Sequence, residues 1–486
     1  MILSLTPPSL QHSPVDPEGP QIWAPLDLPS DRLFGTDGIR GHYGDRLTPA
    51  LAVQVGFWAG RTLLEAAPDS ASPKIILGRD SRNSGEVLAT ALAAGLTAAG
   101  CEVLDLGLCP TPAVAHLAQT TEALGGVMIS ASHNPPEDNG IKFFDGSGAK
   151  LSVDRQRQIE TALREACQDS EGTSRPVMPL PQWAKYSSHP ELVDQYLTSL
   201  CAPLPSLQDL TVVLDLAWGA SAHTAPAAFR QLGATVHCLH ASPDGDRINV
   251  NCGSTHPAAL AEAVVALGAD VGFAFDGDAD RVIAVDNQGR VVDGDYILYL
   301  WGIALRKSGQ LADSTIVTTV MSNLGFERAW QRQGGTFVRT KVGDQYVQAE
   351  MNRRGAQLGG EQSGHVLCPR YSVSGDGTLT ALHLAALVHR ADHCLATLVD
   401  QSFQTYPQVL KNVRVDCCDR RRAWDQDPAL QTAIATAEAA MGDDGRVLIR
   451  ASGTEPVIRV MVEAASDELV QHWTAQLVAA VEAYAS

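Results

Sequence analysis

The stretch KIILGRDSRNSGEVLATALAAGLTAAGCEVLDLG, residues 74–107, indicates the fold class of the chain. A short apolar run, KIIL, is followed by a polar loop with two glycines and then by an alanine- and leucine-rich segment that is typical of a helix. Ser84 can cap this helix and Gly100 can end it. A second apolar run, CEVLDLG, follows at once, so the order is strand, loop, helix, strand, which is the repeating unit of a parallel sheet.

The same order recurs further along the chain. Apolar runs end at Asp276, at Met321 and at Glu361, and a polar or glycine-rich cluster follows each of them. In open α/β sheets, ligands bind beyond the carboxyl ends of the strands. We therefore expect three successive α/β domains with mixed sheets. The C-terminal stretch GRVLIRASGTEPVIRVMVEA indicates two strands around a loop, with a helix after them, so the fourth domain is expected to be a smaller α+β domain.

Length and charge limit the possible functions. The chain has 486 residues and a formal net charge of −19 at pH 7. At about 150 residues per domain, this length predicts three or four domains. The acidic balance argues against a nucleic-acid or anionic-membrane surface, because both need a basic footprint, whereas a small anionic substrate needs only a local basic pocket. The ten cysteines show no C-x-x-C pair, which indicates reduced thiols in a cytoplasmic enzyme.

The N-terminal residues 1–31 are rich in proline and contain no lysine or arginine. A secretory signal would need a basic start and a longer apolar core. We interpret this segment as an extension of the folded domains that is either mobile or draped over them, with docking to a partner as the alternative. No run of about 20 apolar residues is present, so we expect no membrane span.

Three carboxylates stand at alternate positions in the motif DGDADR. On a regular strand Asp276, Asp278 and Asp280 would put like charges on one face, which is costly, whereas in a tight loop they can converge on a hard divalent cation. A calcium EF-hand does not fit, because its sixth position would be Arg281 and its twelfth Asn287. Three carboxylates with one further anionic oxygen suit Mg²⁺ better. The alternative is a solvated acidic turn.

A second polar cluster, SASHNP, follows the apolar run GGVMI. Its Ser132 could be only a turn residue, since serine and asparagine favour turns. No G-x-S-x-G motif surrounds it, so serine-hydrolase chemistry is unsupported. The hydroxyl could instead carry a phosphoryl group. A phosphoserine would supply the anionic oxygen that a cation at Asp276, Asp278 and Asp280 still needs, and the cation would neutralise charge on the transferred group.

Two more clusters suit a sugar phosphate. EQSGH, residues 361–365, combines a carboxylate, a hydroxyl and an imidazole, which are groups that bind sugar hydroxyls, and a polar turn is the alternative. RASGTEP, residues 450–456, offers an arginine, two hydroxyls and loop amides for a phosphate, and an ordinary hairpin is the alternative. Arg40, Arg79 and Arg82 lie near strand ends, and in so acidic a chain we interpret them as anion-binding groups.

The chain resembles the α-D-phosphohexomutase superfamily from about Leu33 to its end. Four motifs stand in the order of that superfamily: the phosphoserine loop ISASHNP, the metal loop FDGDADR, the sugar loop GGEQSGH and the phosphate loop RASGTEP. The motifs LFGTDGIRG, NCGSTHP, VDGD and VMSNLG, together with Gln362 and Gly453, are similar to the branch that acts on glucosamine phosphates. Gln345, where this branch usually has arginine, Ala279 in the metal loop and the proline-rich extension depart from the pattern.

The resemblance implies a heart-shaped arrangement of four domains around a central cleft. It implies that Mg²⁺ is held by Ser132, Asp276, Asp278 and Asp280. The catalytic residues that it implies are Ser132, His133, Lys142, Arg40, Arg281 and His365. Of these, Lys142 and His365 are the candidates for proton transfer. The substrate-binding residues that it implies are Lys341 at the reacting end, Glu361 and Ser363 at the sugar hydroxyls, and Arg450, Ser452, Gly453, Thr454 and Arg459 at the phosphate that does not react.

The activity implied by the resemblance is the interconversion of glucosamine 6-phosphate and glucosamine 1-phosphate, on the route to UDP-N-acetylglucosamine and peptidoglycan. Phosphorylated Ser132 would give its phosphoryl group to the sugar, glucosamine 1,6-bisphosphate would be intermediate and activator, and Ser132 would then recover a phosphoryl group from the other end. Hexosamine phosphates are the expected partners, without nucleic acid or membrane, and a homodimer is possible. The alternatives are phosphoglucomutase or phosphomannomutase activity, a metal-dependent sugar phosphatase, and an inactive sugar-phosphate sensor.

The motifs also predict the domain boundaries. The expected segments are 1–31 for the extension, 32–187 for the domain with the phosphoserine loop, 188–290 for the metal loop, 291–402 for the sugar loop and 403–486 for the phosphate loop.

Overall fold

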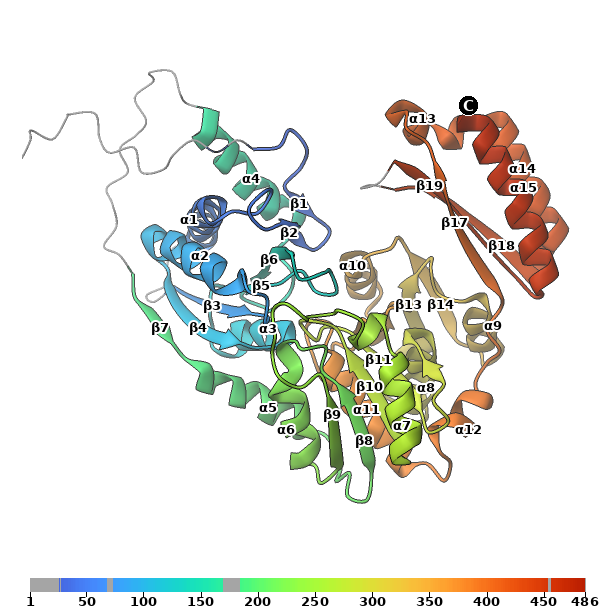
Figure 1. The fold of residues 1–486 in the computed structure, drawn as a ribbon, viewed down its shortest axis with the longest axis horizontal. Coiled ribbons are helices and arrows are strands. Elements are labelled where there is room, and N and C mark those ends of the chain that lie inside the picture. Colours follow the sequence, from blue (N-terminus) through green and yellow to red (C-terminus); the bar gives the residue numbers. More distant parts are fainter. Residues whose placement is uncertain (1–25, 27, 68–72, 169–183, 453–455, 486) are drawn as a thin grey trace, which may run out of the picture.

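The computed structural model describes residues 26, 28–67, 73–168, 184–452 and 456–485 of the chain. The described ribbon contains four sheets, which follow one another in the order of the sequence (Figure 1). Each sheet with its helices is called here the first, second, third or C-terminal part. The first three sheets mix parallel and antiparallel strands, and the C-terminal sheet is smaller and antiparallel. The predicted fold class is confirmed.

The first part has a seven-stranded sheet with the order β1-β2-β6-β5-β3-β4-β7. Its strands are β1 (Phe34–Gly35), β2 (Gly38–His42), β3 (Lys74–Arg79), β4 (Glu102–Leu108), β5 (Gly125–Ile129), β6 (Asp138–Asp145) and β7 (Tyr186–Ser188). Its helices are α1 (Pro49–Ala66), α2 (Gly85–Ala99), α3 (Thr111–Thr120) and α4 (Val153–Gln168). Strands β3 and β4 pair in parallel around α2, as the stretch 74–107 predicts.

The second part has a five-stranded sheet with the order β12-β11-β10-β8-β9. Its strands are β8 (Thr211–Asp215), β9 (Thr235–Leu239), β10 (Val271–Phe275), β11 (Val282–Asp286) and β12 (Val291–Val292), and its helices are α5 (Val193–Cys201), α6 (Thr224–Gln231) and α7 (Ala258–Leu267). Strands β9, β8 and β10 are parallel, and β11 turns back antiparallel to β10. The metal loop is the connection between β10 and β11.

The third part has a four-stranded sheet with the order β14-β13-β15-β16. Its strands are β13 (Thr315–Thr319), β14 (Thr336–Thr340), β15 (Leu358–Gly360) and β16 (Val366–Leu367). Its helices are α8 (Gly294–Lys307), α9 (Leu324–Arg332), α10 (Asp344–Arg354), α11 (Gly377–Arg390) and α12 (Leu395–Asp400). The sugar loop connects β15 with its antiparallel neighbour β16.

The C-terminal part has a three-stranded sheet with the order β17-β19-β18. Its strands are β17 (Gln408–Arg414), β18 (Gly445–Ala451) and β19 (Val457–Ala464), and its helices are α13 (Cys418–Arg422), α14 (Pro428–Met441) and α15 (Asp467–Ala485). The short 3₁₀ helices of the four parts are η1 (Pro190–Leu192), η2 (Ala220–Ala222), η3 (Gly253–Thr255), η4 (Ala312–Ser314), η5 (Trp424–Gln426) and η6 (Gly442–Asp444). No helix in the described ranges combines the length and the apolar composition that a bilayer crossing requires.

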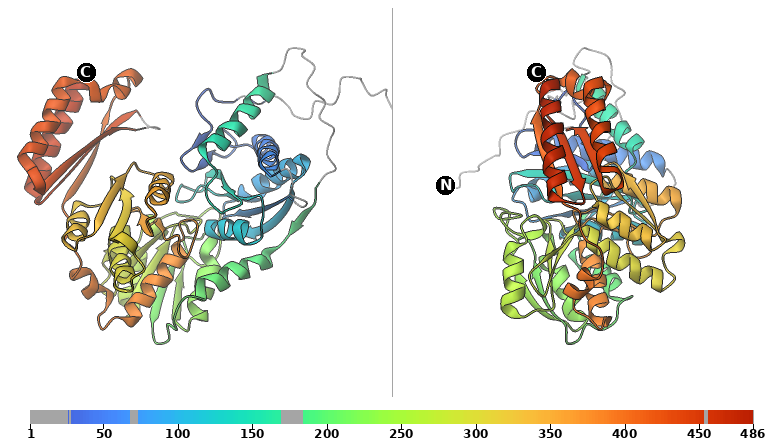
Figure 2. Two further views of the ribbon diagram at one scale, coloured as in Figure 1. Left: turned by 180° about the vertical axis from the view of Figure 1, so that it is seen from behind. Right: turned by 90° about the vertical axis from the view of Figure 1, so that its right-hand side faces the viewer.

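One hydrophobic core runs through the first three parts. It includes Met128 of β5, Phe273 of β10 and Ile316 of β13. The C-terminal part has a separate core, in which Val460 of β19 packs with residues of α14 and α15. In Figures 1 and 2 the C-terminal part stands beside the third part and apart from the first. Shared buried apolar surface therefore fixes the first three parts relative to one another, whereas the C-terminal part contacts the third part through hydrogen bonds, such as that from the amide of Leu324 to Oε1 of Glu463 at 2.9 Å.

Helix α2 ends as predicted but begins differently. Gly100 has a left-handed φ of 103°, and its N–H donates to carbonyls in the last turn of the helix. Ser84 occupies the N-cap position, yet its hydroxyl accepts a hydrogen bond from Asn139 Nδ2 at 2.9 Å and caps no helix amide. Ser84 is thus the N-cap residue, as predicted, but its backbone is helical, with φ −76° and ψ −10°, instead of the extended conformation that directs a side chain to the helix amides.

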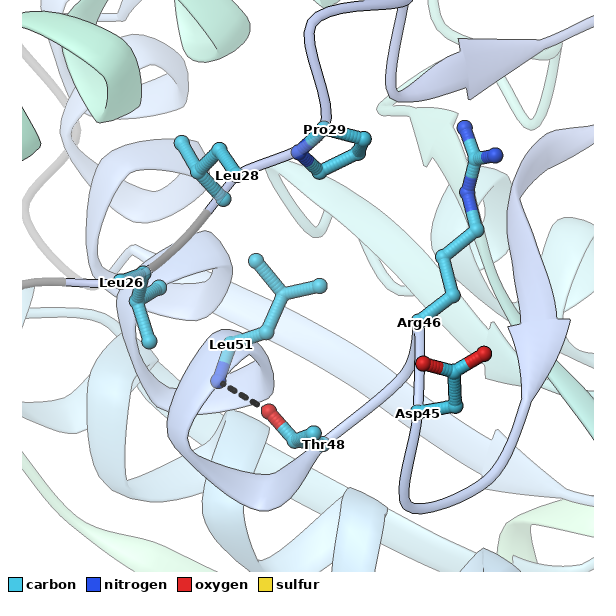
Figure 3. Close-up of a pocket in the computed structure, with 7 residues that line it drawn as sticks. All are labelled: Leu26, Leu28, Pro29, Asp45, Arg46, Thr48 and Leu51. Atoms are coloured by element: carbon cyan, nitrogen blue, oxygen red, sulfur yellow. Dashed lines mark hydrogen bonds between the residues drawn. The ribbon is translucent and has the colours of Figure 1, made fainter.

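The described beginning of the chain lies against the first part. Leu26 and Leu28 pack beside the start of α1, and Asp31 forms an ion pair with Arg46 at 3.2 Å. A cavity of about 520 Å³ lies here, and Figure 3 shows that Leu26, Leu28 and Leu51 line its apolar side opposite Arg46. This stretch of the predicted extension is therefore draped over the first part, whereas residues 1–25 lie outside the described residues.

Helices α1 and α2 pack with their backbones almost in contact. A Cβ atom at Gly95 of α2 would overlap the carbonyl oxygen of Val53 and lie 2.7 Å from the amide nitrogen of Phe57, both in α1. This contact covers the face of the first sheet that is opposite the shared core. The sequence of α2 therefore needs glycine at this position for packing.

We predict that Gly95→Ala destabilises the first part by about 1–3 kcal/mol, although alanine is the better helix former, because its methyl group forces the two helices apart. Thermal unfolding and hydrogen exchange of the α1 and α2 peptides measure the effect. Thr90→Ala, at an exposed position of the same helix, is the control and should change stability by less than about 0.5 kcal/mol. Equal stability of the two variants would contradict the packing argument.

Candidate active site

Three loops from three different sheets meet at the carboxyl ends of their strands. The phosphoserine loop follows β5, the metal loop follows β10, and the sugar loop follows β15. The Oγ atom of Ser132 donates a hydrogen bond of 2.6 Å to Oδ2 of Asp276. His365 of the sugar loop has its Nδ1 atom 3.6 Å from Oδ1 of Asp280. Residues that are far apart in the sequence thus form one cluster.

Ser132 is buried and has a left-handed backbone with a φ of 55°. This conformation is uncommon for a residue other than glycine, so neighbouring groups must hold it in place. The amide of Ser132 donates to Oγ of Ser130 at 2.9 Å, and that hydroxyl donates to Oδ2 of Asp80 at 2.6 Å. The loop therefore presents the Ser132 hydroxyl to the metal loop in one defined orientation.

The three aspartates of the metal loop are suited to a metal ion. Asp276, Asp278 and Asp280 are buried, and each offers an oxygen within 4.8 Å of the others. Burial and the neighbouring Asp280 and Asp278 carboxylates raise the pKa of Asp276 well above its ordinary value. Oδ1 of Asp278 is buried without a hydrogen-bond partner. A buried carboxylate oxygen of this kind is a ligand for a hard divalent cation, so the residues fit a metal.

Lys142 of β6 supplies positive charge to the aspartates. Its Nζ atom lies 2.6 Å from Asp278, 3.2 Å from Asp280 and 3.4 Å from Asp37, and the side chain is 2% exposed. Burial alone would lower the pKa of Lys142, but these carboxylates raise it above its usual range. The ammonium group therefore keeps its proton at neutral pH. This favours a charge-compensating role for Lys142 over the predicted role in proton transfer.

His365, the other candidate for proton transfer, lies between two carboxylates. Its Nδ1 atom faces Asp280, and its Nε2 atom lies 3.3 Å from Asp344. Although burial opposes it, these carboxylates raise the pKa of His365 to about 9. The imidazole is therefore protonated near neutral pH and can donate a proton.

His133 has the opposite electrostatic environment. Its Nδ1 atom is 3.4 Å from the Ser132 hydroxyl. Burial, together with the cationic Arg281 and Arg40, lowers the pKa of His133 to about 4. The imidazole is therefore neutral at physiological pH. The structure thus places Arg40 and Arg281 close enough to His133 to lower its pKa.

The prediction that Arg82 binds an anion is not supported by its contacts. Its guanidinium is fully buried and pairs with Asp80, with Nε 3.0 Å from Oδ2. The remaining N–H groups donate to backbone carbonyls of the phosphoserine loop, including those of Ser132 at 3.0 Å and Asn134 at 2.7 Å. The donors of Arg82 are occupied by protein, so this residue shapes the loop. Arg79, which was also interpreted as an anion-binding group, lies 3.8 Å from the carboxylate of Glu86.

The sugar loop packs directly against the strand that follows the metal loop. Gly364 has a φ of 88°, and a Cβ atom there would overlap the carbonyl oxygen of Val282. Oε1 of Glu361 accepts a hydrogen bond from the amide of Gly343 at 3.0 Å. Oγ of Ser363 is buried without a hydrogen-bond partner, so it is free to bond a ligand hydroxyl. Lys341, also expected at this site, is exposed at the end of β14.

The strands that flank the phosphate loop lie in the C-terminal sheet, away from these residues. Arg450 of β18 and Arg459 of β19 stand directly opposite each other in the C-terminal sheet, and burial together with Arg459 lowers the pKa of Arg450. Like charges directly opposite each other are unfavourable unless an anion joins them. Ser452 closes the hairpin through its amide, which donates to Val457. Figures 1 and 2 show this sheet apart from the first part, and Gly453 and Thr454 lie outside the described residues.

Three charged residues near the cluster were not predicted from the sequence. Asp37 pairs with Lys150 and Arg40, and Lys150 also lies 2.5 Å from Asp344. They join the ion pairs around Lys142 and His365 into one network across the first, second and third parts. Asp37 lies within the motif LFGTDGIRG and Asp344 precedes Gln345, so these stretches could have suggested them, whereas nothing local distinguishes Lys150.

Family models match the chain in four consecutive blocks. They are described as phosphoglucomutase/phosphomannomutase alpha/beta/alpha domains I, II and III and the C-terminal domain, and they match residues 31–169, 194–289, 293–406 and 410–480, respectively.

Several curated relatives are similar over nearly the whole chain. A phosphoglucosamine mutase from Trichodesmium erythraeum is 58% identical over 95% of this chain and 93% of its own length. Phosphoglucosamine mutases from a Picosynechococcus strain and from Acaryochloris marina are each 60% identical, over 94% and 93% of this chain and 94% and 98% of their own lengths.

Solved structures share the fold. A phosphoglucomutase/phosphomannomutase family protein from Burkholderia thailandensis has a TM-score of 0.77 and 25% identity, and the match covers 93% of this chain and 97% of that one. Aspergillus fumigatus N-acetylphosphoglucosamine mutase, in complex with GlcNAc-6P and magnesium, has a TM-score of 0.64 and 17% identity, with 94% and 97% covered.

We predict that Lys142→Met destabilises the protein by about 3–5 kcal/mol, because buried carboxylates lose their cationic partner. Adding Mg²⁺ should restore more stability to this variant than to the wild type, since a bound cation replaces the missing charge. Thermal unfolding with and without Mg²⁺ measures both effects. Lys411→Met, at an exposed lysine of β17, is the control and should behave like the wild type. A variant as stable as this control would show that Lys142 does not balance the aspartates.

Proposed function

The chain belongs to the phosphoglucomutase/phosphomannomutase family, and from this premise we propose that it interconverts glucosamine 6-phosphate and glucosamine 1-phosphate. The observation that carries the proposal is the hydrogen bond of 2.6 Å between Ser132 Oγ and Asp276 Oδ2. It places a buried hydroxyl at a cluster of carboxylates that is suited to a metal ion. This is the arrangement that phosphoryl transfer through a phosphoserine requires.

The reaction starts with a phosphoryl group on Ser132. The O1 hydroxyl of glucosamine 6-phosphate attacks phosphorus, the bond to Ser132 Oγ breaks, and the proton of O1 passes to a base. The product is glucosamine 1,6-bisphosphate. After the sugar turns around, Ser132 Oγ attacks the phosphorus at O6, the bond between phosphorus and O6 breaks, the proton of the serine hydroxyl passes to O6, and glucosamine 1-phosphate leaves. His365 is the proposed proton carrier, because it lies at the metal loop and its pKa of about 9 keeps a proton available: it gives this proton to Ser132 Oγ as the bond breaks, and the imidazole is then the base that takes the proton of O1.

The proposed metal ligands are Asp276, Asp278, Asp280 and an oxygen of phosphorylated Ser132, and Mg²⁺ is the proposed ion. A divalent cation bound there neutralises negative charge on the transferred phosphoryl group. The protein contributes fixed positive charge from Lys142 and Arg281. His133 remains neutral beside the hydroxyl, so it can orient the reacting group without adding charge.

The substrate is proposed to be held at two further places. Glu361 and Ser363 would bind sugar hydroxyls, and the unpartnered Oγ of Ser363 supports this role. Arg450 and Arg459, with Ser452, Gly453 and Thr454, would bind the phosphate that does not react. Lys341 and Arg40 would lie at the reacting end. Since the C-terminal part has its own core, we propose that it closes over the bound sugar and brings Arg450 toward Ser132.

The choice of glucosamine rests on the relatives. Phosphoglucosamine mutases are 58% to 60% identical to the chain over nearly their full lengths. Gln362, one of the residues typical of that branch, donates to Asp293 Oδ2 at 3.1 Å, and this bond links the sugar loop to the VDGD motif. We further propose that the reaction supplies UDP-N-acetylglucosamine synthesis in the cytoplasm, with Mg²⁺ and glucosamine 1,6-bisphosphate as cofactors and with association into a homodimer.

The deciding experiment combines mass spectrometry with an activity assay. The proposal expects a phosphoryl group on the peptide that contains Ser132. It also expects the highest kcat/KM for glucosamine 6-phosphate, compared with glucose and mannose phosphates, and a rate that depends on Mg²⁺. Preference for glucose or mannose phosphate would assign the chain to phosphoglucomutase or phosphomannomutase activity. Release of inorganic phosphate in step with substrate loss would indicate a phosphatase, and sugar binding without turnover would indicate a sensor.

We predict that Ser132→Ala lowers kcat by about a thousandfold or more, because the acceptor of the phosphoryl group is lost. The variant should still fold and bind glucosamine 6-phosphate. Steady-state kinetics and calorimetric binding measure these properties. Ser206→Ala, at an exposed serine, is the control and should be fully active. Substantial turnover by Ser132→Ala would rule out this serine as the phosphoryl carrier.

We predict that Arg450→Ala raises KM by about 10- to 100-fold, because the non-reacting phosphate loses a charge-assisted hydrogen bond. The matched control is Arg414→Ala, since Arg414 is exposed on β17 of the same sheet. Initial rates at varied substrate concentration separate KM from kcat. An unchanged KM would show that the phosphate is held elsewhere.

A further inference from the structure

A loop of the second part reaches the phosphoserine loop of the first part. It runs from His240 to Pro257, between β9 and α7, and contains the motif NCGSTHP. Asp215, buried at the end of β8, holds both ends of this loop. Its Oδ1 atom accepts a hydrogen bond from Nδ1 of His240 at 2.8 Å, and its Oδ2 atom accepts one from the amide of Gly253 at 2.9 Å. The middle of the loop is thereby fixed relative to the second sheet.

Asn249 lies in the middle of this loop and bonds to the backbone around Ser132. Its Nδ2 atom donates to the carbonyl oxygen of Ser132 at 2.8 Å and to that of Asn134 at 3.1 Å. Asn249 is buried and has a left-handed φ of 63°. Asparagine is one of the few residue types that adopts this conformation readily. The position therefore suits asparagine both for its backbone and for its two side-chain donors.

The same two carbonyls accept hydrogen bonds from Arg82, which belongs to the first part. The metal loop comes to the same point, because a Cβ atom at Gly277 would lie 2.7 Å from the Ser132 carbonyl oxygen and 2.9 Å from Asn249 Nδ2. The carbonyl of Ser132 is thus the place where the phosphoserine loop, the metal loop and the Asn249 loop touch. Arg82 shapes the loop from its own part, and Asn249 ties it to the part that carries the aspartates.

We propose that Asn249 is a positioning residue for phosphoryl transfer, which holds the Ser132 hydroxyl in register with the metal loop; this inference rests on the proposed function. Asn249 itself touches backbone carbonyls, and it acts through Ser132. In-line transfer requires the reacting oxygen to be placed within a few tenths of an ångström, and a misplacement of about 1 Å can cost a hundredfold in rate. Ser132 needs such support because its own backbone conformation is unfavourable.

The position of Asn249 predicts which kinetic constant changes. The sugar hydroxyls and the non-reacting phosphate are held by other residues in the proposed function, so binding of the substrate does not depend on Asn249. Loss of the amide donors should therefore lower kcat and leave KM almost unchanged. A residue that only stabilises the fold would instead lower the folded fraction, which thermal unfolding measures, and would leave kcat per folded molecule unchanged.

The test uses Asn249→Gly in the full-length chain. Glycine accepts the left-handed backbone, so this variant removes the two donors without adding strain. We expect kcat to fall about 10- to 100-fold and KM to change less than about threefold. Asn249→Asp, which keeps the shape but turns an oxygen toward the two carbonyls, should be at least as slow. A kcat within about twofold of the wild type in either variant would overturn the inference.

Asn83→Ala is the matched control. Nδ2 of Asn83 donates to Oδ1 of Asp246 at 2.6 Å, so it joins the same loop to the first part without contacting the Ser132 carbonyl. This variant should keep its kcat. If Asn83→Ala lost as much kcat as Asn249→Gly, the loop contact as a whole would be responsible and the specific role of Asn249 would be refuted.

Hydrogen exchange provides a readout that does not depend on the activity. The peptide of residues 130–140 should exchange faster in Asn249→Gly than in the wild type and in Asn83→Ala. Unchanged exchange would overturn the inference even if the enzyme is active. If the wild type had no mutase activity, the proposed function would be refuted. Faster exchange in Asn249→Gly would then still show that Asn249 ties the two loops together.

Discussion

The concentration of three carboxylates in one buried loop is the constraint on which the rest of the structure depends. Asp276, Asp278 and Asp280 are almost completely removed from water, and their mutual repulsion in a low dielectric is large. Positive charge must therefore come from the surroundings. Lys142 and His365, from two other parts of the chain, supply some of it, and the unpartnered oxygen of Asp278 leaves room for a metal ion.

Close packing keeps these charges in place. The first three parts share one hydrophobic core, and close backbone contacts bring their loops together. Gly277 allows the metal loop to touch the Ser132 carbonyl, and Gly364 allows the sugar loop to lie on β11. The C-terminal part is different, because its core is its own. The fold thus places the aspartate cluster within the shared core of three parts and places Arg450 and Arg459 in a sheet with a core of its own.

The sequence predicts the residues with distinctive chemistry better than the residues that support them. Ser132 and the three aspartates stand in motifs, and the structure brings them together as those motifs imply. The interpretation of Arg82 as an anion-binding group is not supported by its contacts. Its backbone partners come from a loop some fifty positions away, and no local pattern reveals them. Lys150 was missed for the same reason, since its partners Asp37 and Asp344 lie in distant segments.

The sequence by itself determined the order of the four sheets, the loops that carry polar groups and the chemical type of each group, because strand and helix periodicity and motif composition are local properties. Only the tertiary structure decided which side chains carry a proton and which residues they contact. Lys142 keeps its proton, His365 gains one and His133 remains neutral, because a pKa depends on burial and on charges that arrive from remote segments. The position of the C-terminal sheet, which carries Arg450, relative to Ser132 is likewise a property of domain packing, which no stretch of sequence contains.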